Sequence, residues 1–120
     1  MKIWTASGWW CAACALAAGV AAPAMAQDAV YARNLASTCF TCHGTDGRSV
    51  GGIPPSLAGQ DKNYLLQAMK DFKAGKRPAT LMHQQAKGYT DEQLEAIAGY
   101  FAGVKAGPGA AAPAAPAPRY

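Results

Sequence analysis

The sequence has few charged residues and only two histidines, and it lacks the alternation of apolar and polar residues that is typical of β-strands. Only 15% of its 120 residues are charged, and eleven basic against seven acidic residues give a formal charge of just +4. It has no long basic run and no basic patch interleaved with aromatic residues, which argues against nucleic-acid binding. No stretch alternates apolar and polar residues as a half-buried strand does. We therefore expect an all-α fold.

The N-terminal residues 1–26 are typical of an export signal. Lys2 provides a positive start, Trp9–Ala22 is an apolar run, and Ala24-Met25-Ala26 supplies a small-x-small cleavage pattern. Gly19 and Pro23 interrupt the run, which is too short and small-sided for a membrane span. We expect cleavage of this signal peptide and a periplasmic protein, with an uncleaved N-terminal anchor as the alternative.

The C-terminal residues 106–120 consist almost entirely of Ala, Pro and Gly. Such a segment cannot bury enough apolar surface to offset its ordering entropy, so we expect a disordered tail. The remaining residues, 27–105, make one small domain. A domain of this length buries only about 60% of its unfolded surface and is marginal without a further stabilising element.

The chemistry of the chain is concentrated in Cys39-Phe40-Thr41-Cys42-His43. Two cysteines three positions apart, followed at once by a histidine, form the pattern of c-type haem attachment. Each thiol adds across one vinyl group of the haem, and the histidine donates a ring nitrogen to the iron. The motif predicts that Cys39 and Cys42 tether one haem and that His43 is its proximal ligand. The bound haem would also supply the apolar body that a small domain needs.

Other uses of the motif are less well supported. A thioredoxin-like redox pair requires a surrounding βαβ pattern, which the sequence lacks. A structural zinc site requires four ligands, and outside the leader only His83 could join the motif. A disulfide between Cys39 and Cys42 remains the alternative for an exported protein. A second C-x-x-C lies inside the leader, but Ala15 stands where a haem site needs histidine.

Apolar periodicity predicts helices at residues 29–38, 61–74 and 90–102. The first is expected to end where the haem tether begins. The second starts at Asp61 and stops at Gly75. The third opens with a capping box in which Thr90 caps and Gln93 reaches back. Its expected inward face consists of Leu94, Ile97, Ala98 and Phe101. Residues 44–59 and 80–88 are predicted loops.

The loop after the motif contains Pro54-Pro55. The second nitrogen of a ligating histidine normally donates to a backbone carbonyl or a carboxylate, which fixes the orientation of the ring. A rigid proline-bearing loop just downstream of His43 is well placed to provide that carbonyl. Alternatively the two prolines only stiffen a turn, and the residues alone leave both interpretations open.

The function depends on which residue, if any, binds the iron on the side opposite His43. Outside the leader the candidates are Met69, Met82 and His83. Met69 lies in the apolar stripe of a predicted helix, where methionine is usually core filler. Met82 lies thirty-nine positions after His43, far enough to reach the opposite haem face, and is favoured over His83 and over an open site. A Met/His pair marks electron-carrying cytochromes and raises the reduction potential.

A basic cluster lies at the end of the second predicted helix and just after it: Lys70, Lys73, Lys76 and Arg77. Such a cluster could steer a negatively charged partner protein. A solvated helix face is the favoured interpretation, because faces of this kind are common.

Together these residues resemble class I cytochrome c. The likeness spans about residues 30–103 and rests on the haem motif, Pro55-x-Leu57-Ala58-Gly59-Gln60, the helix at 64–72, and Met82 ahead of Gly88-Tyr89-Thr90-Asp91-Glu92. Two loops, at residues 51–54 and 75–84, are more narrowly similar to the cytochrome subunit of flavocytochrome c sulfide dehydrogenase and to related sulfur-oxidation cytochromes.

The resemblance implies a class I cytochrome c fold, with three to five short helices around one covalently bound haem c. Cys39 and Cys42 match the thioether positions, His43 and Met82 match the axial ligands, and Pro55 matches the proline whose carbonyl accepts from the proximal histidine. Some relatives carry two haem domains, whereas this chain has one motif.

The implied function is one-electron transfer rather than enzyme catalysis, with electrons accepted from redox partner proteins such as a flavoprotein sulfide dehydrogenase. Two alternatives are an obligate haem subunit of such an enzyme, and an open-site haem that binds ligands or reacts with peroxide.

Overall fold

A computed structural model describes residues 22–107, which form four α-helices, one 3-10 helix and, within that range, no strand. The elements are α1 (Ala22–His43), η1 (Thr45–Gly47), α2 (Lys62–Lys73), α3 (Met82–Lys87) and α4 (Asp91–Gly103). The prediction of an all-α fold with three to five helices is confirmed. Most of the predicted leader and of the predicted tail lies outside the described residues.

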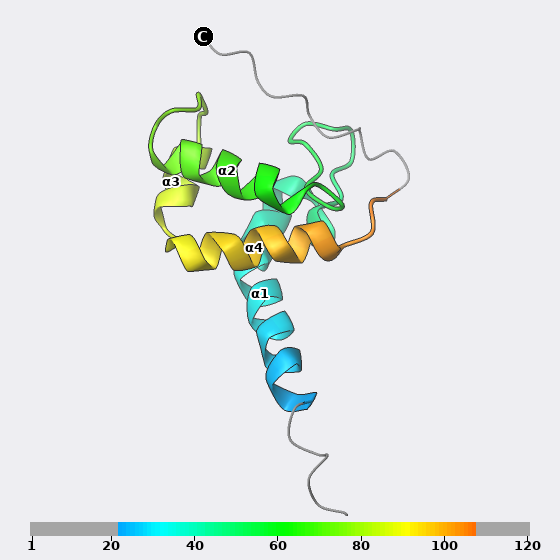
Figure 1. Cartoon of the computed structure of the whole chain (residues 1–120). Helices are drawn as coiled ribbons and strands as arrows, with labels where there is room; N and C mark the ends of the chain where they lie inside the picture. Colours follow the sequence, from blue (N-terminus) through cyan, green and yellow to red (C-terminus); the bar gives the residue numbers. More distant parts are fainter. Residues whose placement is uncertain (1–21, 108–120) are drawn as a thin grey trace, which may run out of the picture.

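The helices pack in a chain of contacts that is not their order in the sequence. α4 packs against both α1 and α2, and α3 packs against α2. Figure 1 shows α4 crossing α1, with α2 alongside α4 and the N-terminal part of α1 extending beyond the other helices. Residues 26–31 of α1 are all exposed, so the packed part of α1 is its C-terminal half, which carries the haem motif.

The core lies where α1, α2 and α4 meet. Ala36 of α1 is completely buried and packs with Leu65 of α2 and with Ile97, Ala98 and Phe101 of α4. An alanine at this crossing lets the two helix backbones approach closely. All four residues predicted for the inward face of the last helix are buried, since Leu94 also has no exposed surface.

The termini of α2 and α4 follow the sequence signals. Asp61 caps α2 by accepting a hydrogen bond of 2.8 Å from the backbone N–H of Tyr64. The chain leaves that helix through Gly75, whose φ of +72° favours glycine. At α4 both bonds of the capping box between Thr90 and Gln93 are present, at 3.2 and 2.9 Å. The predicted caps are confirmed.

The prediction that the first helix ends where the tether begins is wrong. α1 continues through both cysteines and ends at His43, and it also spans the predicted cleavage site after Ala26. No proline or glycine interrupts residues 24–43, so the helix stops only at Gly44, whose φ is +80°. A side chain there would be impossible, because a Cβ would lie 2.1 Å from the carbonyl oxygen of Arg48.

The prediction of an uninterrupted loop at residues 80–88 is also wrong. Six of these residues form α3, which starts at Met82 and ends before Gly88. All six (Met-His-Gln-Gln-Ala-Lys) are compatible with a helix, and several are good helix formers. The segment is too short to form a stable helix by itself, so we attribute α3 to its packing against α2.

Candidate functional site

The last turn of α1 carries both cysteines of the motif. Cys39 and Cys42 are three positions apart on one helix, so their side chains lie on the same face. Both are free thiols, Cys39 half-buried and Cys42 exposed, and no disulfide joins them. Burial raises the pKa of the Cys39 thiol, an effect opposed by its contact with Thr38. Two free thiols on one face fit a pair of thioether bonds to a single flat group.

The imidazole of His43 is buried and oriented. Its Nδ1 lies 2.7 Å from the carbonyl oxygen of Pro55, and only 8% of the residue is exposed. Because a carbonyl can only accept, Nδ1 carries the proton and Nε2 keeps the lone pair that binds a metal. A histidine held in this tautomer fits a proximal haem ligand.

A tight turn after His43 holds the segment that carries Pro55. In this turn the N–H of Gly47 donates to the carbonyl of Gly44 at 2.8 Å. The carbonyl of Gly47 accepts from the backbone N–H groups of Leu57 at 2.8 Å and Ala58 at 3.1 Å. Pro55 lies two residues before Leu57, so these hydrogen bonds hold the turn against the segment whose carbonyl contacts His43.

Asp46, inside this turn, connects it to two helices. Its carboxylate accepts a hydrogen bond of 2.6 Å from the hydroxyl of Tyr100 on α4. Arg33 of α1 and Arg48 lie 3.5 and 3.4 Å from the same carboxylate. The Tyr100 hydroxyl and the two guanidinium groups lower the pKa of Asp46, while partial burial and Asp46 itself raise the pKa of Tyr100. Sequence reasoning missed this cluster, because no local pattern connects residues this far apart.

The three candidates for the other side of the iron lie on α2 and α3. Met82 is the first residue of α3 and is half-buried, while Met69 lies in the partly buried stripe of α2. His83 is already engaged, since its Nε2 donates to the carbonyl of Arg77 at 2.9 Å. Its ring also packs edge-on against Phe72, with centroids 6.2 Å apart. Of the neighbours Met82 and His83, the methionine has the side chain that no hydrogen bond holds.

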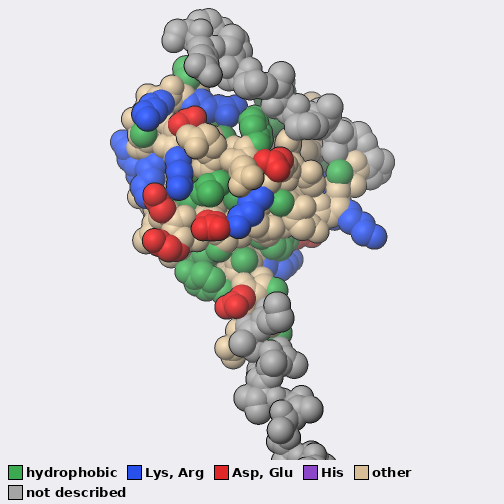
Figure 2. Space-filling model, viewed as in Figure 1, with side chains coloured by type: hydrophobic (Ala, Val, Ile, Leu, Met, Phe, Trp, Pro, Cys, Tyr) green, Lys and Arg blue, Asp and Glu red, His purple; other side chains and the backbone are tan. Residues whose placement is uncertain are grey.

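The basic cluster Lys70, Lys73, Lys76 and Arg77 is partly neutralised within the molecule. Lys73 lies 2.8 Å from Asp91, and Lys70 lies 3.9 Å from the same carboxylate. The guanidinium of Arg77 lies 5.0 Å from the ring centroid of Phe72. Figure 2 shows Lys and Arg side chains gathered over the end of α2 next to α3, with acidic side chains beside them. These contacts favour a solvated helix face whose charges are partly paired over a basic patch that steers a negatively charged partner protein.

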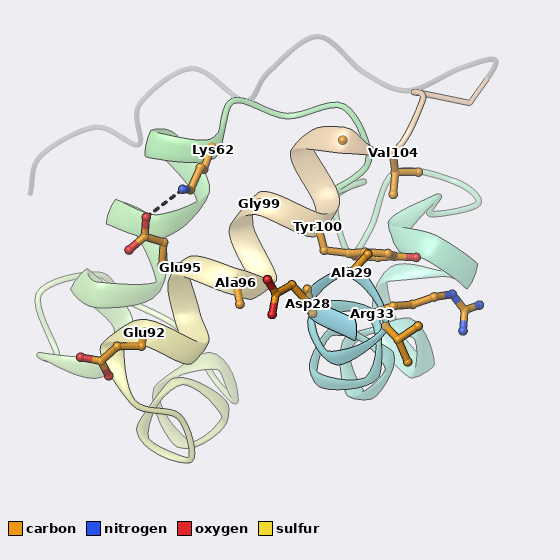
Figure 3. A pocket seen from close by; sticks show the side chains of 13 residues that line it. Asp28, Ala29, Arg33, Lys62, Glu92, Glu95, Ala96, Gly99, Tyr100 and Val104 are labelled. Atoms are coloured by element: carbon orange, nitrogen blue, oxygen red, sulfur yellow. Dashed lines mark hydrogen bonds and ion pairs between the residues drawn. The ribbon is translucent and has the colours of Figure 1, made fainter. Parts of the chain in front are cut away.

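One described depression is separate from the haem motif. It has a volume of about 830 Å³, lies between α1 and α4, and is lined mainly by small and charged residues (Figure 3). The ion pair of 2.8 Å between Lys62 and Glu95 closes one side of it. None of Cys39, Cys42 and His43 lines it, so it is not the cofactor site.

Two further observations concern residues 22–107 only. They hold no group of three or more His, Cys, Asp or Glu side chains that could bind a metal ion. Within the same range, no helix has the length and apolar character needed to cross a membrane.

Comparison with known proteins identifies the family. Residues 29–105 match the family model described as cytochrome c, and the chain belongs to the cytochrome c family. It is 46% identical over 67 residues to the cytochrome subunit of sulfide dehydrogenase from Chlorobaculum tepidum, covering 56% of this chain and 60% of that protein. It is 39% identical over 79 residues to cytochrome c-554(548) from Halomonas halodenitrificans, covering 63% of this chain and 95% of that one.

A solved structure supports the same assignment. The structure of Acidithiobacillus ferrooxidans cytochrome c4 superposes with a TM-score of 0.55 at 35% identity, and the match covers 69% of this chain and 50% of that one. This chain therefore spans half of the cytochrome c4 chain and 60% of the sulfide dehydrogenase subunit, but nearly all of cytochrome c-554(548).

Membership of this family defines the cofactor and the general role. The protein binds haem c covalently in the region of Cys39 and Cys42, and its single C-x-x-C-H motif makes it a monohaem c-type cytochrome. Members of the family are electron carriers, so the chain carries electrons and is not an enzyme. The free thiols on one helix face and the available Nε2 of His43 fit this cofactor.

Proposed function

We propose that this chain is an exported one-electron carrier in which His43 and Met82 ligate the haem iron, and that it accepts electrons from a flavoprotein sulfide dehydrogenase. The observation that carries the ligand assignment is the 2.7 Å contact between Nδ1 of His43 and the carbonyl of Pro55. It holds the ring in the tautomer in which Nε2 can bind iron, and it makes that nitrogen more basic.

The residues of the chain have separate tasks in this mechanism. Cys39 and Cys42 fix the cofactor to the last turn of α1, so that His43 follows the tether directly. When bound, the haem supplies a one-electron iron couple. The Pro55 carbonyl orients the imidazole, and Met82 would bind the iron when haem is present, which would leave no iron position for a substrate. The arrangement supports electron transfer and disfavours ligand chemistry at the metal.

Met82 is the proposed distal ligand because the adjacent candidate, His83, already makes a hydrogen bond within the protein. Nε2 of His83 donates to the carbonyl of Arg77, and the edge-on contact with Phe72 holds the ring against α2. Binding of His83 to iron through Nε2 would break that hydrogen bond, whereas binding of Met82 breaks none. A thioether is also the ligand that gives a histidine-ligated haem a high potential.

The proposed donor follows from similarity to the sulfide dehydrogenase subunit and from the two loops noted above. The proposed export and periplasmic location follow from the predicted signal in residues 1–26. An obligate subunit of a flavin enzyme is the competing proposal. It predicts that a yellow, FAD-containing chain remains bound through purification, whereas a free carrier is isolated alone.

Absorption spectra of the oxidised and reduced haem protein test the ligand assignment. We expect the long-wavelength band of methionine–iron ligation in the oxidised protein, and we expect Met82→Leu to abolish it. Met69→Leu is the matched control, because it makes the same change on α2 and should keep the band. A band that survives Met82→Leu, or rapid carbon monoxide binding by the unmodified protein, would show that Met82 is not the ligand.

The donor is tested by mixing the oxidised haem protein with a flavoprotein sulfide dehydrogenase and sulfide. Rapid reduction of the haem that depends on both the flavoprotein and sulfide is the expected result. Reduction by sulfide at the same rate without the flavoprotein would contradict the proposed partner, and it would leave the ligand assignment unaffected.

A further inference from the structure

The cluster around Asp46 has no assigned role, although it lies three residues after His43. Asp46 has a φ of +53°, a left-handed conformation that non-glycine residues rarely adopt, with Asp and Asn the most tolerant. It is the only non-glycine residue with positive φ among the described residues. A residue kept in this conformation is held there by its surroundings.

The contacts of Asp46 differ in strength. Its ion pairs with Arg33 and Arg48 are long, at 3.5 and 3.4 Å, and the two arginine side chains are 56% and 42% exposed, so the pairs contribute little. The bond from the Tyr100 hydroxyl is short, at 2.6 Å, and part-buried. A short O–H···O⁻ bond is among the strong hydrogen bonds of proteins. The strongest contact of Asp46 is therefore its hydrogen bond with Tyr100, which connects the turn to α4.

The position of Tyr100 makes this a connection to a rigid element. The ring packs against Phe40 and Phe101, with centroids 6.1 and 5.2 Å away. Figure 3 shows the Tyr100 side chain extending from α4 past α1, with its hydroxyl on the same side as Arg33. The hydroxyl is thus presented at a fixed place, and Asp46 binds there.

From Asp46 the connection continues to the proximal histidine. The next residue, Gly47, accepts hydrogen bonds from Leu57 and Ala58, which follow Pro55 closely. The carbonyl of Pro55 accepts from Nδ1 of His43. A shift of the turn would therefore move the carbonyl that faces the imidazole.

We propose that Asp46 and Tyr100 are positioning residues for the axial imidazole: they hold the turn on α4, and the turn holds the Pro55 carbonyl at Nδ1 of His43. This inference depends on the proposed ligation of iron by His43. A strong bond at Nδ1 raises the basicity of the ligand and favours ferric iron. Weakening that bond favours ferrous iron and raises the midpoint potential.

Tyr100→Phe tests the proposal, because it removes the hydroxyl, keeps the packed ring and leaves every formal charge unchanged. Tyr64→Phe is the matched control. Tyr64 lies on α2, and its hydroxyl accepts a long hydrogen bond of 3.5 Å from Arg77. Two quantities are measured on the haem protein: the midpoint potential, and the exchange rate of the His43 ring N–H by NMR. We expect Tyr100→Phe to raise the potential and to speed ring N–H exchange about tenfold, a factor set by the net contribution of one hydrogen bond. We expect Tyr64→Phe to change neither.

Asp46→Asn is the second variant, because asparagine tolerates the same backbone conformation and accepts from Tyr100 more weakly. It also removes a charge, so its ring N–H exchange, rather than its potential, is the decisive value. Unchanged exchange in both variants, with histidine ligation intact in the spectrum, would overturn the positioning role alone. A spectrum without histidine ligation in the unmodified protein would instead overturn the proposed function.

Discussion

Gly47 lies directly against the ring of Phe101. A Cβ placed on Gly47 would be 2.7 Å from two carbons of that ring and 3.0 Å from the side chain of Leu57. Phe101 is fully buried at the centre of the core and cannot move aside. The turn that follows the haem motif is therefore seated on the core through a residue without a side chain.

Gly47→Ala should strongly destabilise the protein. The substitution forces a side chain into a residue with a φ of +76° and against a buried ring, which together cost about 2–5 kcal/mol. Gly51→Ala is the matched control, because Gly51 also has a positive φ, +86°, but a Cβ added there would have nothing within 4 Å. Denaturant unfolding of the haem protein measures both. Equal losses would mean that contact with Phe101 contributes nothing.

Pro55→Ala should lower stability slightly and leave the haem ligands in place. The backbone carbonyl that faces His43 remains, and the loss reflects the greater freedom of the unfolded chain, about 0.5–1 kcal/mol. Unfolding monitored together with the visible spectrum tests this. If histidine ligation disappeared, the proline ring itself, and not only its carbonyl, would be needed to hold the imidazole.

Thr90→Ala should destabilise α4 by about 1 kcal/mol, because it removes the hydroxyl that accepts from the N–H of Gln93. Thr90→Ser keeps that hydroxyl and should retain most of the stability. The two variants are compared by thermal unfolding under identical conditions. A serine variant as unstable as the alanine variant would show that the capping bond is not the cause.

The ion pair of Asp91 with Lys73 predicts a pH dependence. The hydrogen bond and charge of Lys73 lower the pKa of Asp91 in the folded state, so the folded state binds fewer protons than the unfolded chain. The resulting stability is present above the unfolded pKa and is lost as the pH falls below about 4. Asp46 and Glu95 also have lowered pKa values and act in the same direction.

Asp91→Asn should therefore reduce the acid sensitivity of the protein. The loss of unfolding free energy between about pH 6 and about pH 3 should be smaller in the variant than in the unmodified protein. Because Asp91 is exposed, added salt should shrink this difference. A variant with the same pH dependence as the unmodified protein would contradict the prediction.

The sequence predicted what depends on neighbouring residues. The start of α2 at Asp61, the capping box of α4 and the buried face of α4 are all set by spacings of three or four residues, and all are confirmed. The haem motif is equally local, which is why the cofactor could be inferred from five consecutive residues.

The features that the sequence did not predict depend on distant contacts. α3 is a single short helix that packs on α2, and nothing in its own six residues requires a helix. The pairing of Asp46 with Tyr100 joins positions 54 residues apart. Only the packing of α1 on α4 brings such groups together, and no periodicity along the chain reveals it.

Because α1 runs without a break to His43, both cysteines and the proposed proximal ligand lie within five consecutive residues at the end of one helix. The thioethers and the histidine thus enclose only a few residues, and they restrict the unfolded chain very little. The proposed bond from iron to Met82 is different, since it closes a loop of thirty-nine residues. In a chain-entropy model, a cross-link of that span removes unfolded-state freedom equivalent to about 4 kcal/mol. If Met82 ligates the iron, that bond is the coordinate link through which the haem connects distant parts of the chain.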